Sequence, residues 1–109
     1  MSDVQERIRQ IVADHPVVVF MKGVAEMPQC GFSNMVVRIL DHMGVEFHDV
    51  NVLADEDIRQ GVKEFANWPT IPQLYVKGEF IGGCDIVREM FQSGELKQLF
   101  EDKGVTVAA

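Results

Sequence analysis

The stretch PVVVFMKG, residues 16–23, constrains the fold of this chain most. A short, continuous apolar run of this kind is typical of a strand that is buried on both faces. The stretch VEFHDVNV, residues 45–52, is a second predicted strand, and a helical pattern lies between the two. Such a strand–helix–strand unit implies a parallel pair of strands with a right-handed crossover.

The remaining segments extend this unit with further helices and a hairpin. PQLYVKGEFIGG, residues 72–83, predicts two antiparallel strands with a tight turn at Lys77-Gly78. Ser2 is the predicted cap of the first helix. Helices are predicted at about 3–14, between the Cys30 region and Gly44, at 55–66, at 85–93 and at 95–103, and a loop at 23–29. The pattern predicts one α/β domain over residues 1–109, a three-layer sandwich with a mixed, four-stranded sheet.

Composition and charge limit the class of function. The 109 residues are 47% hydrophobic and 25% charged, as in an ordinary globular protein. No apolar run approaches the roughly 20 residues that a membrane-spanning helix needs. The N-terminal stretch MSDVQERIRQ has no apolar signal region, so we expect a cytoplasmic protein with reduced thiols. The net charge of −7 argues against nonspecific binding of nucleic acid.

Cys30 is the candidate reactive residue. It follows a strand and a loop and lies at the start of a helix, where free backbone N–H groups and the helix dipole stabilise a thiolate. Lys22 ends the preceding strand on the same rim and would lower the pKa of the thiol further. A buried, unreactive thiol is the alternative, although the residues around it, 28–33, are polar and turn-like. Phe32 is interpreted as a core anchor.

The other candidate ligands are interpreted as structural. Cys84 is expected to be packed and unreactive, and its pairing with Cys30 is possible but not required. The two cysteines do not have the spacing of a zinc site. His15, His42 and His48 fall on different predicted elements, so they are interpreted as surface residues and not as metal ligands.

Three motifs in order carry a family resemblance. CGFS at 30–33, KGVAEMPQ before it and WPTIPQLYVKGEFIGGCDI after it resemble the CGFS-type monothiol glutaredoxins. The likeness extends from about Val4 to Leu99. It implies a thioredoxin-like (glutaredoxin) fold with an extra N-terminal helix, and a cis peptide bond at Ile71-Pro72, the one kind of bond where cis costs little.

The resemblance also implies a glutathione site. Lys22 and Arg59 would bind the glycine carboxylate, for which a guanidinium has matching geometry. The backbone of Ile71 would pair with the cysteinyl part, while the Cys84 N–H and Asp85 would hold the γ-glutamyl end. Without the resemblance, Lys22 and Arg59 are ordinary solvated charges and Asp85 is an ordinary helix cap.

The main functional hypothesis concerns an iron–sulfur cluster. A [2Fe–2S] centre usually takes four thiolates. Cys30 from each of two chains and two bound glutathiones would supply them, which predicts a homodimer bridged by a labile cluster. Such a protein would carry the cluster to apo iron–sulfur proteins, and the family resemblance adds a BolA-type protein as a partner.

The alternative hypothesis is a glutathione-dependent monothiol oxidoreductase that removes glutathione from substrates. Ser33 occupies the place of a second thiol, and a hydroxyl cannot resolve a disulfide. An external thiol would therefore have to complete each turnover. A third hypothesis is a binding module in which Cys30 is regulatory or structural.

Overall fold

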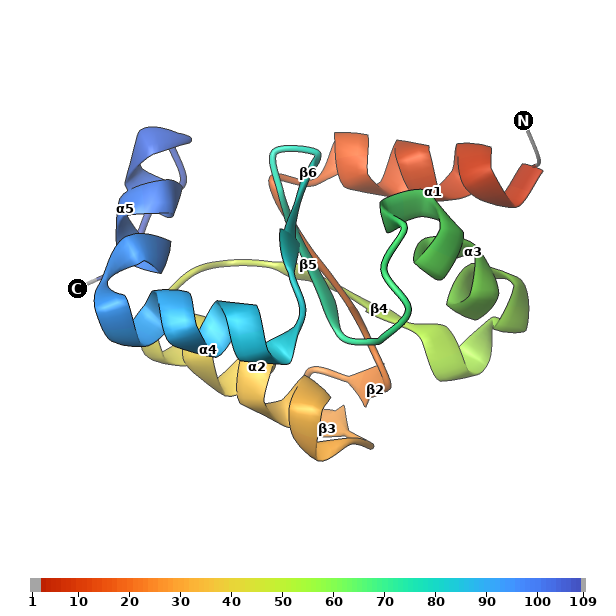
Figure 1. Ribbon diagram of the computed structural model, residues 1–109, viewed down its shortest axis with the longest axis horizontal. Coiled ribbons are helices and arrows are strands. Elements are labelled where there is room, and N and C mark those ends of the chain that lie inside the picture. The colour runs from red at the N-terminus through yellow and green to blue at the C-terminus, as the bar shows by residue number, and fades with distance from the viewer. Residues whose placement is uncertain (1–2, 109) are drawn as a thin grey trace.

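A mixed four-stranded sheet forms the middle layer of the protein, whose computed structural model describes residues 3–108 (Figure 1). Strand β1 (Val17–Met21) runs parallel to β4 (His48–Asn51) and antiparallel to β5 (Gln73–Val76). Strand β6 (Glu79–Gly82) pairs with β5, so the strand order is β4-β1-β5-β6. The predicted parallel pair and the predicted hairpin are both confirmed.

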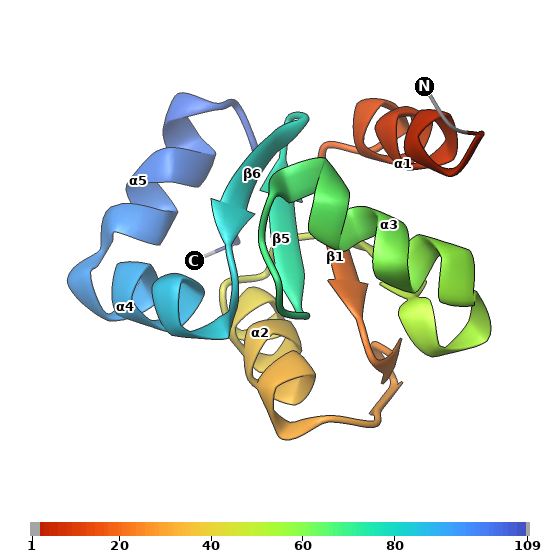
Figure 2. The same ribbon diagram turned by 45° about the vertical axis from the view of Figure 1, so that its right-hand side comes forward.

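Helices cover both faces of this sheet, which gives the predicted three layers (Figures 1 and 2). They are α2 (Gly31–His42) and α4 (Cys84–Ser93) on one face, α1 (Asp3–Asp14) and α3 (Glu56–Ala66) on the other, and α5 (Glu95–Asp102), which packs against α4. A short 3₁₀ helix, η1 (Val52–Ala54), leads from β4 to α3. The predicted cap Ser2 lies outside the described residues. Within residues 3–108, no helix has the length and apolar character needed to cross a membrane.

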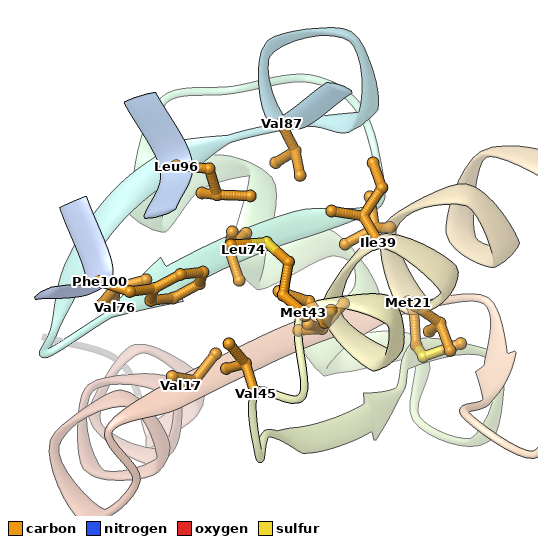
Figure 3. Close-up of a cluster of buried hydrophobic side chains, with 14 residues drawn as sticks. Val17, Met21, Ile39, Met43, Val45, Leu74, Val76, Val87, Leu96 and Phe100 are labelled. Carbon is orange, nitrogen blue, oxygen red and sulfur yellow. The ribbon is translucent and has the colours of Figure 1, made fainter. Parts of the chain in front are cut away.

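Strand β1 is buried on both faces because it contributes to two separate cores. Successive side chains of a strand point to opposite faces of the sheet. Val17, Val19 and Met21 therefore pack with α2, α4 and α5 (Figure 3), whereas Val18 and Phe20 pack with α1 and α3. All five side chains are at most 1% exposed, which confirms the interpretation of the apolar run.

The segment predicted as a loop at 23–29 contains a small hairpin that the sequence did not indicate. It consists of β2 (Gly23–Val24) and β3 (Met27–Pro28). Side chains of β4 hold the hairpin in place. Asn51 Oδ1 accepts a hydrogen bond from the Gly23 N–H at 2.9 Å, and Asp49 Oδ2 accepts one from the Ala25 N–H at 2.8 Å.

Strand β4 begins three residues later and ends one residue earlier than the predicted strand at 45–52. At its end, Asn51 caps η1 by accepting from the Leu53 N–H at 3.0 Å. At the other end of β4, the ring of His48 stacks on that of His15, with centroids 3.9 Å apart. His42 and His48 are exposed and His15 is partly buried, in keeping with the interpretation of these histidines as surface residues. The sequence did not indicate the stacking, which arises because parallel pairing of β1 with β4 brings the residues before β1 beside the start of β4.

Candidate functional site

Cys30 is the N-cap residue of α2, at the rim of the sheet where β1 ends. Its backbone is extended (φ −147°, ψ 135°), and its carbonyl accepts the Asn34 N–H at 2.9 Å, so the helix begins directly after it. The side chain forms no capping hydrogen bond, and the thiol is free and half-buried. The unpaired N–H groups of the first helical turn therefore surround the sulfur.

This setting lowers the pKa of the Cys30 thiol. The largest cause is the backbone N–H of Ser33, which stabilises the thiolate; partial burial opposes it. The N–H of Phe32, the charge of Lys22 and the Ser33 hydroxyl act in the same direction as the Ser33 N–H. Cys30 is thus placed to react or to bind metal as a thiolate.

Lys22 is held beside Cys30 through its backbone. Its N–H donates to the hydroxyl of the fully buried Ser33 at 3.1 Å, and its carbonyl accepts the Gln29 N–H at 2.9 Å. Ser33, which occupies the place of the second cysteine in a dithiol site, therefore joins the end of β1 to α2.

A cavity of about 180 Å³ lies between the loop that precedes β5 and the start of α4. Cys30 is not one of its lining residues, but Phe32 of the same helical turn is, and so is Cys84, which interacts electrostatically with Cys30. Its walls come from α2 (Phe32), from the loop (Trp68, Thr70, Ile71 and Pro72) and from the start of α4 (Gly83, Cys84, Asp85 and Ile86). The Ile71-Pro72 peptide bond is cis, as the family resemblance implies.

Gly83 brings the two walls close together. A Cβ at this position would lie 3.2 Å from Trp68 Nε1 and 3.3 Å from the Pro72 carbonyl oxygen. Such contacts are tighter than ordinary van der Waals packing, so a side chain here would require Trp68 or the Pro72 carbonyl to move by a few tenths of an ångström.

Three of the five predicted binding residues line the cavity, whereas Lys22 and Arg59 do not. Ile71, Cys84 and Asp85 line the cavity, and Asp85 lies 3.6 Å from the guanidinium of Arg88. Arg59 is not among the lining residues. Its guanidinium lies 3.7 Å from Glu56, and its buried Nε has no hydrogen-bond partner within residues 3–108.

Cys84 differs from Cys30 in its chemistry although the two sulfurs interact electrostatically. Burial raises the pKa of the Cys84 thiol, and the adjacent carboxylate of Asp85 raises it further. Cys84 is half-buried with a free thiol. The two pKa shifts have opposite directions, so Cys30 loses its proton at a lower pH than Cys84.

The interpretation of Phe32 as a core anchor is wrong. Phe32 is 64% exposed and stands at the mouth of the cavity. Phe32 lies one turn before the buried Val36 and two turns before the buried Ile39, so the helical repeat alone places it on the buried face of α2. Only the tertiary structure, in which this first turn lies beside the cavity, leaves Phe32 exposed.

Trp68 and Thr70 also line the cavity, although neither was predicted from the sequence to belong to the site. Both lie in the WPTIP segment that carried part of the resemblance. A tryptophan in such a segment is more often part of a core, so only the position of the loop in space indicates its place in the site.

Each chain has one cysteine whose thiol pKa is lowered, Cys30. In the part of the chain that the structure describes, no group of three or more His, Cys, Asp and Glu side chains is arranged to hold a metal ion. A metal centre at Cys30 would therefore need ligands from outside this chain.

Comparison with known proteins identifies the family. The profile of the glutaredoxin family matches residues 17–81. A Synechocystis protein described as an uncharacterized monothiol glutaredoxin is 57% identical over 99 residues, which cover 91% of this chain and 92% of that protein. The chain belongs to the monothiol glutaredoxin family.

Solved structures confirm the glutaredoxin fold. The solution structure of a monomeric truncated mutant of Trypanosoma brucei 1-C-Grx1 matches with a TM-score of 0.89 and 41% identity, covering 100% of this chain and 99% of that one. The crystal structure of a buckwheat glutaredoxin–glutathione complex matches with a TM-score of 0.83 and 26% identity, covering 96% and 93%. The monothiol glutaredoxin described here thus has the predicted thioredoxin-like architecture.

Proposed function

We propose that this monothiol glutaredoxin binds glutathione beside Cys30 and carries a [2Fe–2S] cluster as cargo between two copies of the chain. The observation that carries the proposal is the Cys30 thiol of lowered pKa near a cavity whose lining includes Ile71 and the start of α4, where the pKa of Cys84 is raised.

Three features support glutathione as the ligand. Glutathione has a carboxylate at each end and an amine beside one of them. The start of α4 offers free backbone N–H groups for a carboxylate, and Asp85 lies beside them for the amine. Lys22, whose charge acts on Cys30, would bind the other carboxylate. Glutathione is also the ligand in the buckwheat complex.

Arg59 would reach the glycine carboxylate only after its side chain moves. Arg59 is outside the cavity wall and pairs weakly with the exposed Glu56. Its side chain would have to turn from Glu56 to bind the glycine carboxylate, and its unpaired Nε leaves a donor for that contact.

The number of available thiolate ligands supports a cluster that is shared between two chains. A [2Fe–2S] cluster usually has four thiolate ligands, and each chain has one cysteine whose pKa is lowered. Two copies of Cys30 and two glutathiones complete the set. Two of these four ligands are small exchangeable molecules, so the cluster would be labile and suited to transfer to apo iron–sulfur proteins.

Anaerobic reconstitution with iron, sulfide and glutathione tests the proposal. We expect visible absorbance of a [2Fe–2S] centre that elutes with a dimer and depends on added glutathione. Cys30→Ser should abolish the absorbance, and Cys84→Ser is the matched control that should retain it. A Cys30→Ser protein that keeps its cluster would contradict the proposal.

A second candidate function is supported by the lowered pKa of Cys30, which suits a nucleophile. The Cys30 thiolate would attack the glutathione sulfur of a mixed disulfide and release the substrate as a thiolate. A second glutathione thiolate would then attack the Cys30–glutathione disulfide, freeing Cys30 and forming glutathione disulfide. A glutathione-coupled assay that gives only background turnover would count against this function.

A further inference from the structure

We infer that Gln73 is a positioning residue of the glutathione pocket, because its buried amide fixes the loop that forms one wall. The inference rests on the proposed binding of glutathione beside Cys30. Gln73 is the first residue of β5 and is fully buried, although it does not line the cavity itself.

The amide of Gln73 holds the loop at two points. Its Nε2 donates to the carbonyl oxygen of Trp68 at 3.1 Å and to that of Thr70 at 3.2 Å. A carbonyl oxygen can only accept, so the NH₂ group of the amide must face the loop. One side chain therefore joins two carbonyls that bracket Pro69 and fixes their separation.

A second residue fixes the amide itself. The hydroxyl of Tyr75 donates to Gln73 Oε1 at 3.0 Å, in the buried interior. Residues 73 and 75 share a face of β5, since side chains alternate along a strand. The Tyr75 ring packs edge-on against Phe20, with centroids 5.5 Å apart, and also contacts Phe65 and Phe80. The aromatic core thus determines where the hydroxyl, and in turn the amide, can lie.

The loop that Gln73 holds determines the shape of the cavity. Trp68, Thr70, Ile71 and Pro72 form its wall on one side. Across the cavity, the indole Nε1 of Trp68 comes within 3.2 Å of the site of a Cβ on Gly83. A loop released from Gln73 could move away from Gly83, which would widen the cavity and misplace the Ile71 backbone.

Hydrogen bonds of this kind contribute about 0.5–1.5 kcal/mol each to the stability of the state that contains them. Loss of both bonds to the loop should therefore weaken glutathione binding by about fivefold to 150-fold, provided that binding requires the fixed loop. A residue that only stabilises the core would lower the stability of the protein and leave the affinity of the folded fraction unchanged.

The test compares Gln73→Leu with the native protein. Leucine has a similar volume and removes both donations. Calorimetry with reduced glutathione measures affinity, urea unfolding measures stability, and acrylamide quenching of fluorescence without ligand measures the loop. Trp68 is the single tryptophan of the sequence, so its emission reports this loop alone.

We expect Gln73→Leu to lose affinity by about fivefold to 150-fold and to make Trp68 more accessible to acrylamide. Tyr75→Phe keeps the ring and removes only the bond to the amide, so it should lose about twofold to twelvefold. Gln98→Leu is the matched control. Gln98 is exposed on α5 and bonds Asp102, so neither affinity nor quenching should change.

An unchanged glutathione affinity in folded Gln73→Leu would overturn the inference. If that variant does not fold, Tyr75→Phe decides in the same way, and an unchanged affinity and unchanged quenching overturn it. If the native protein binds no glutathione, the proposed function fails. The quenching measurement then still shows whether Gln73 fixes the loop, and unchanged quenching overturns that claim as well.

Discussion

The hydroxyl of Ser33 accepts a hydrogen bond from the backbone N–H of Lys22 at 3.1 Å. Ser33 is fully buried and follows Cys30 at the position where a dithiol site has its second sulfur. The contact joins the end of β1 to the first turn of α2. Ser33 therefore fixes the position of the reactive thiol and also lowers its pKa through its N–H and its hydroxyl.

Ser33→Ala should destabilise the protein by about 1 kcal/mol, because the N–H of Lys22 loses its partner in a partly buried position. Urea unfolding measures this loss. Ser93→Ala is the control, since Ser93 is exposed at the end of α4 and water can replace its partners. Equal stability of native protein and Ser33→Ala would show that the hydrogen bond contributes nothing.

The two thiols should titrate on opposite sides of the ordinary cysteine value of 9.0. The pH dependence of the rate of alkylation by iodoacetamide reports the pKa of one thiol at a time. The Cys84→Ser protein reports Cys30, and the Cys30→Ser protein reports Cys84. The reaction of Cys30 should reach half its maximum at the lower pH, because backbone N–H groups and Lys22 stabilise its thiolate. Coincident profiles would contradict this difference.

Lys22→Glu should raise the pKa of Cys30, since a repulsive charge replaces an attractive one. The variant should also weaken glutathione affinity in calorimetry and reduce retention of a reconstituted cluster. Lys97→Glu, on the exposed surface of α5, makes the same change in net charge and is the control. An equal effect of the two variants would mean that only net charge matters.

Gly83→Ala should weaken glutathione binding about tenfold, because the new methyl group meets Trp68 and the Pro72 carbonyl at 3.2–3.3 Å and occupies the cavity. Gly31→Ala is a matched control at the start of the other helix beside the site. A Cβ there meets nothing within 4 Å, so affinity should be kept. Calorimetry with glutathione compares the two, and equal affinities would show that the approach to Gly83 is not part of the site.

Acid should destabilise the fold partly through His48. Burial lowers the pKa of His48 from its ordinary value of 6.5, and the neighbouring His15 lowers it further. The unfolded chain therefore binds this proton at a higher pH than the folded one, so stability is lost as pH falls through about 6.5. His48→Gln should show a smaller decrease in unfolding free energy between about pH 7.5 and pH 5.5. The same decrease in both proteins would exclude His48 as the cause.

Local patterns determined most of the secondary structure. The apolar run at β1 and the helical repeats were sufficient because they reflect which side chains must be buried. The turn at Lys77-Gly78 was also predictable, and both residues have positive φ, 52° and 82°, as a tight hairpin turn requires. Cys30 could be selected from the sequence because the groups that lower its pKa belong mainly to its own helical turn.

Contacts between distant segments were decided by the tertiary structure alone. The stacking of His15 on His48 follows from strand register, and the distance of Arg59 from the cavity follows from the packing of α3. The hydrogen bond from Gln73 to the Trp68 carbonyl joins residues that are close in sequence. It forms only because β5 buries the Gln73 amide against the loop. A sequence shows which groups are available, whereas burial and distance, which set the strength of hydrogen bonds and charges, exist only once the chain is folded.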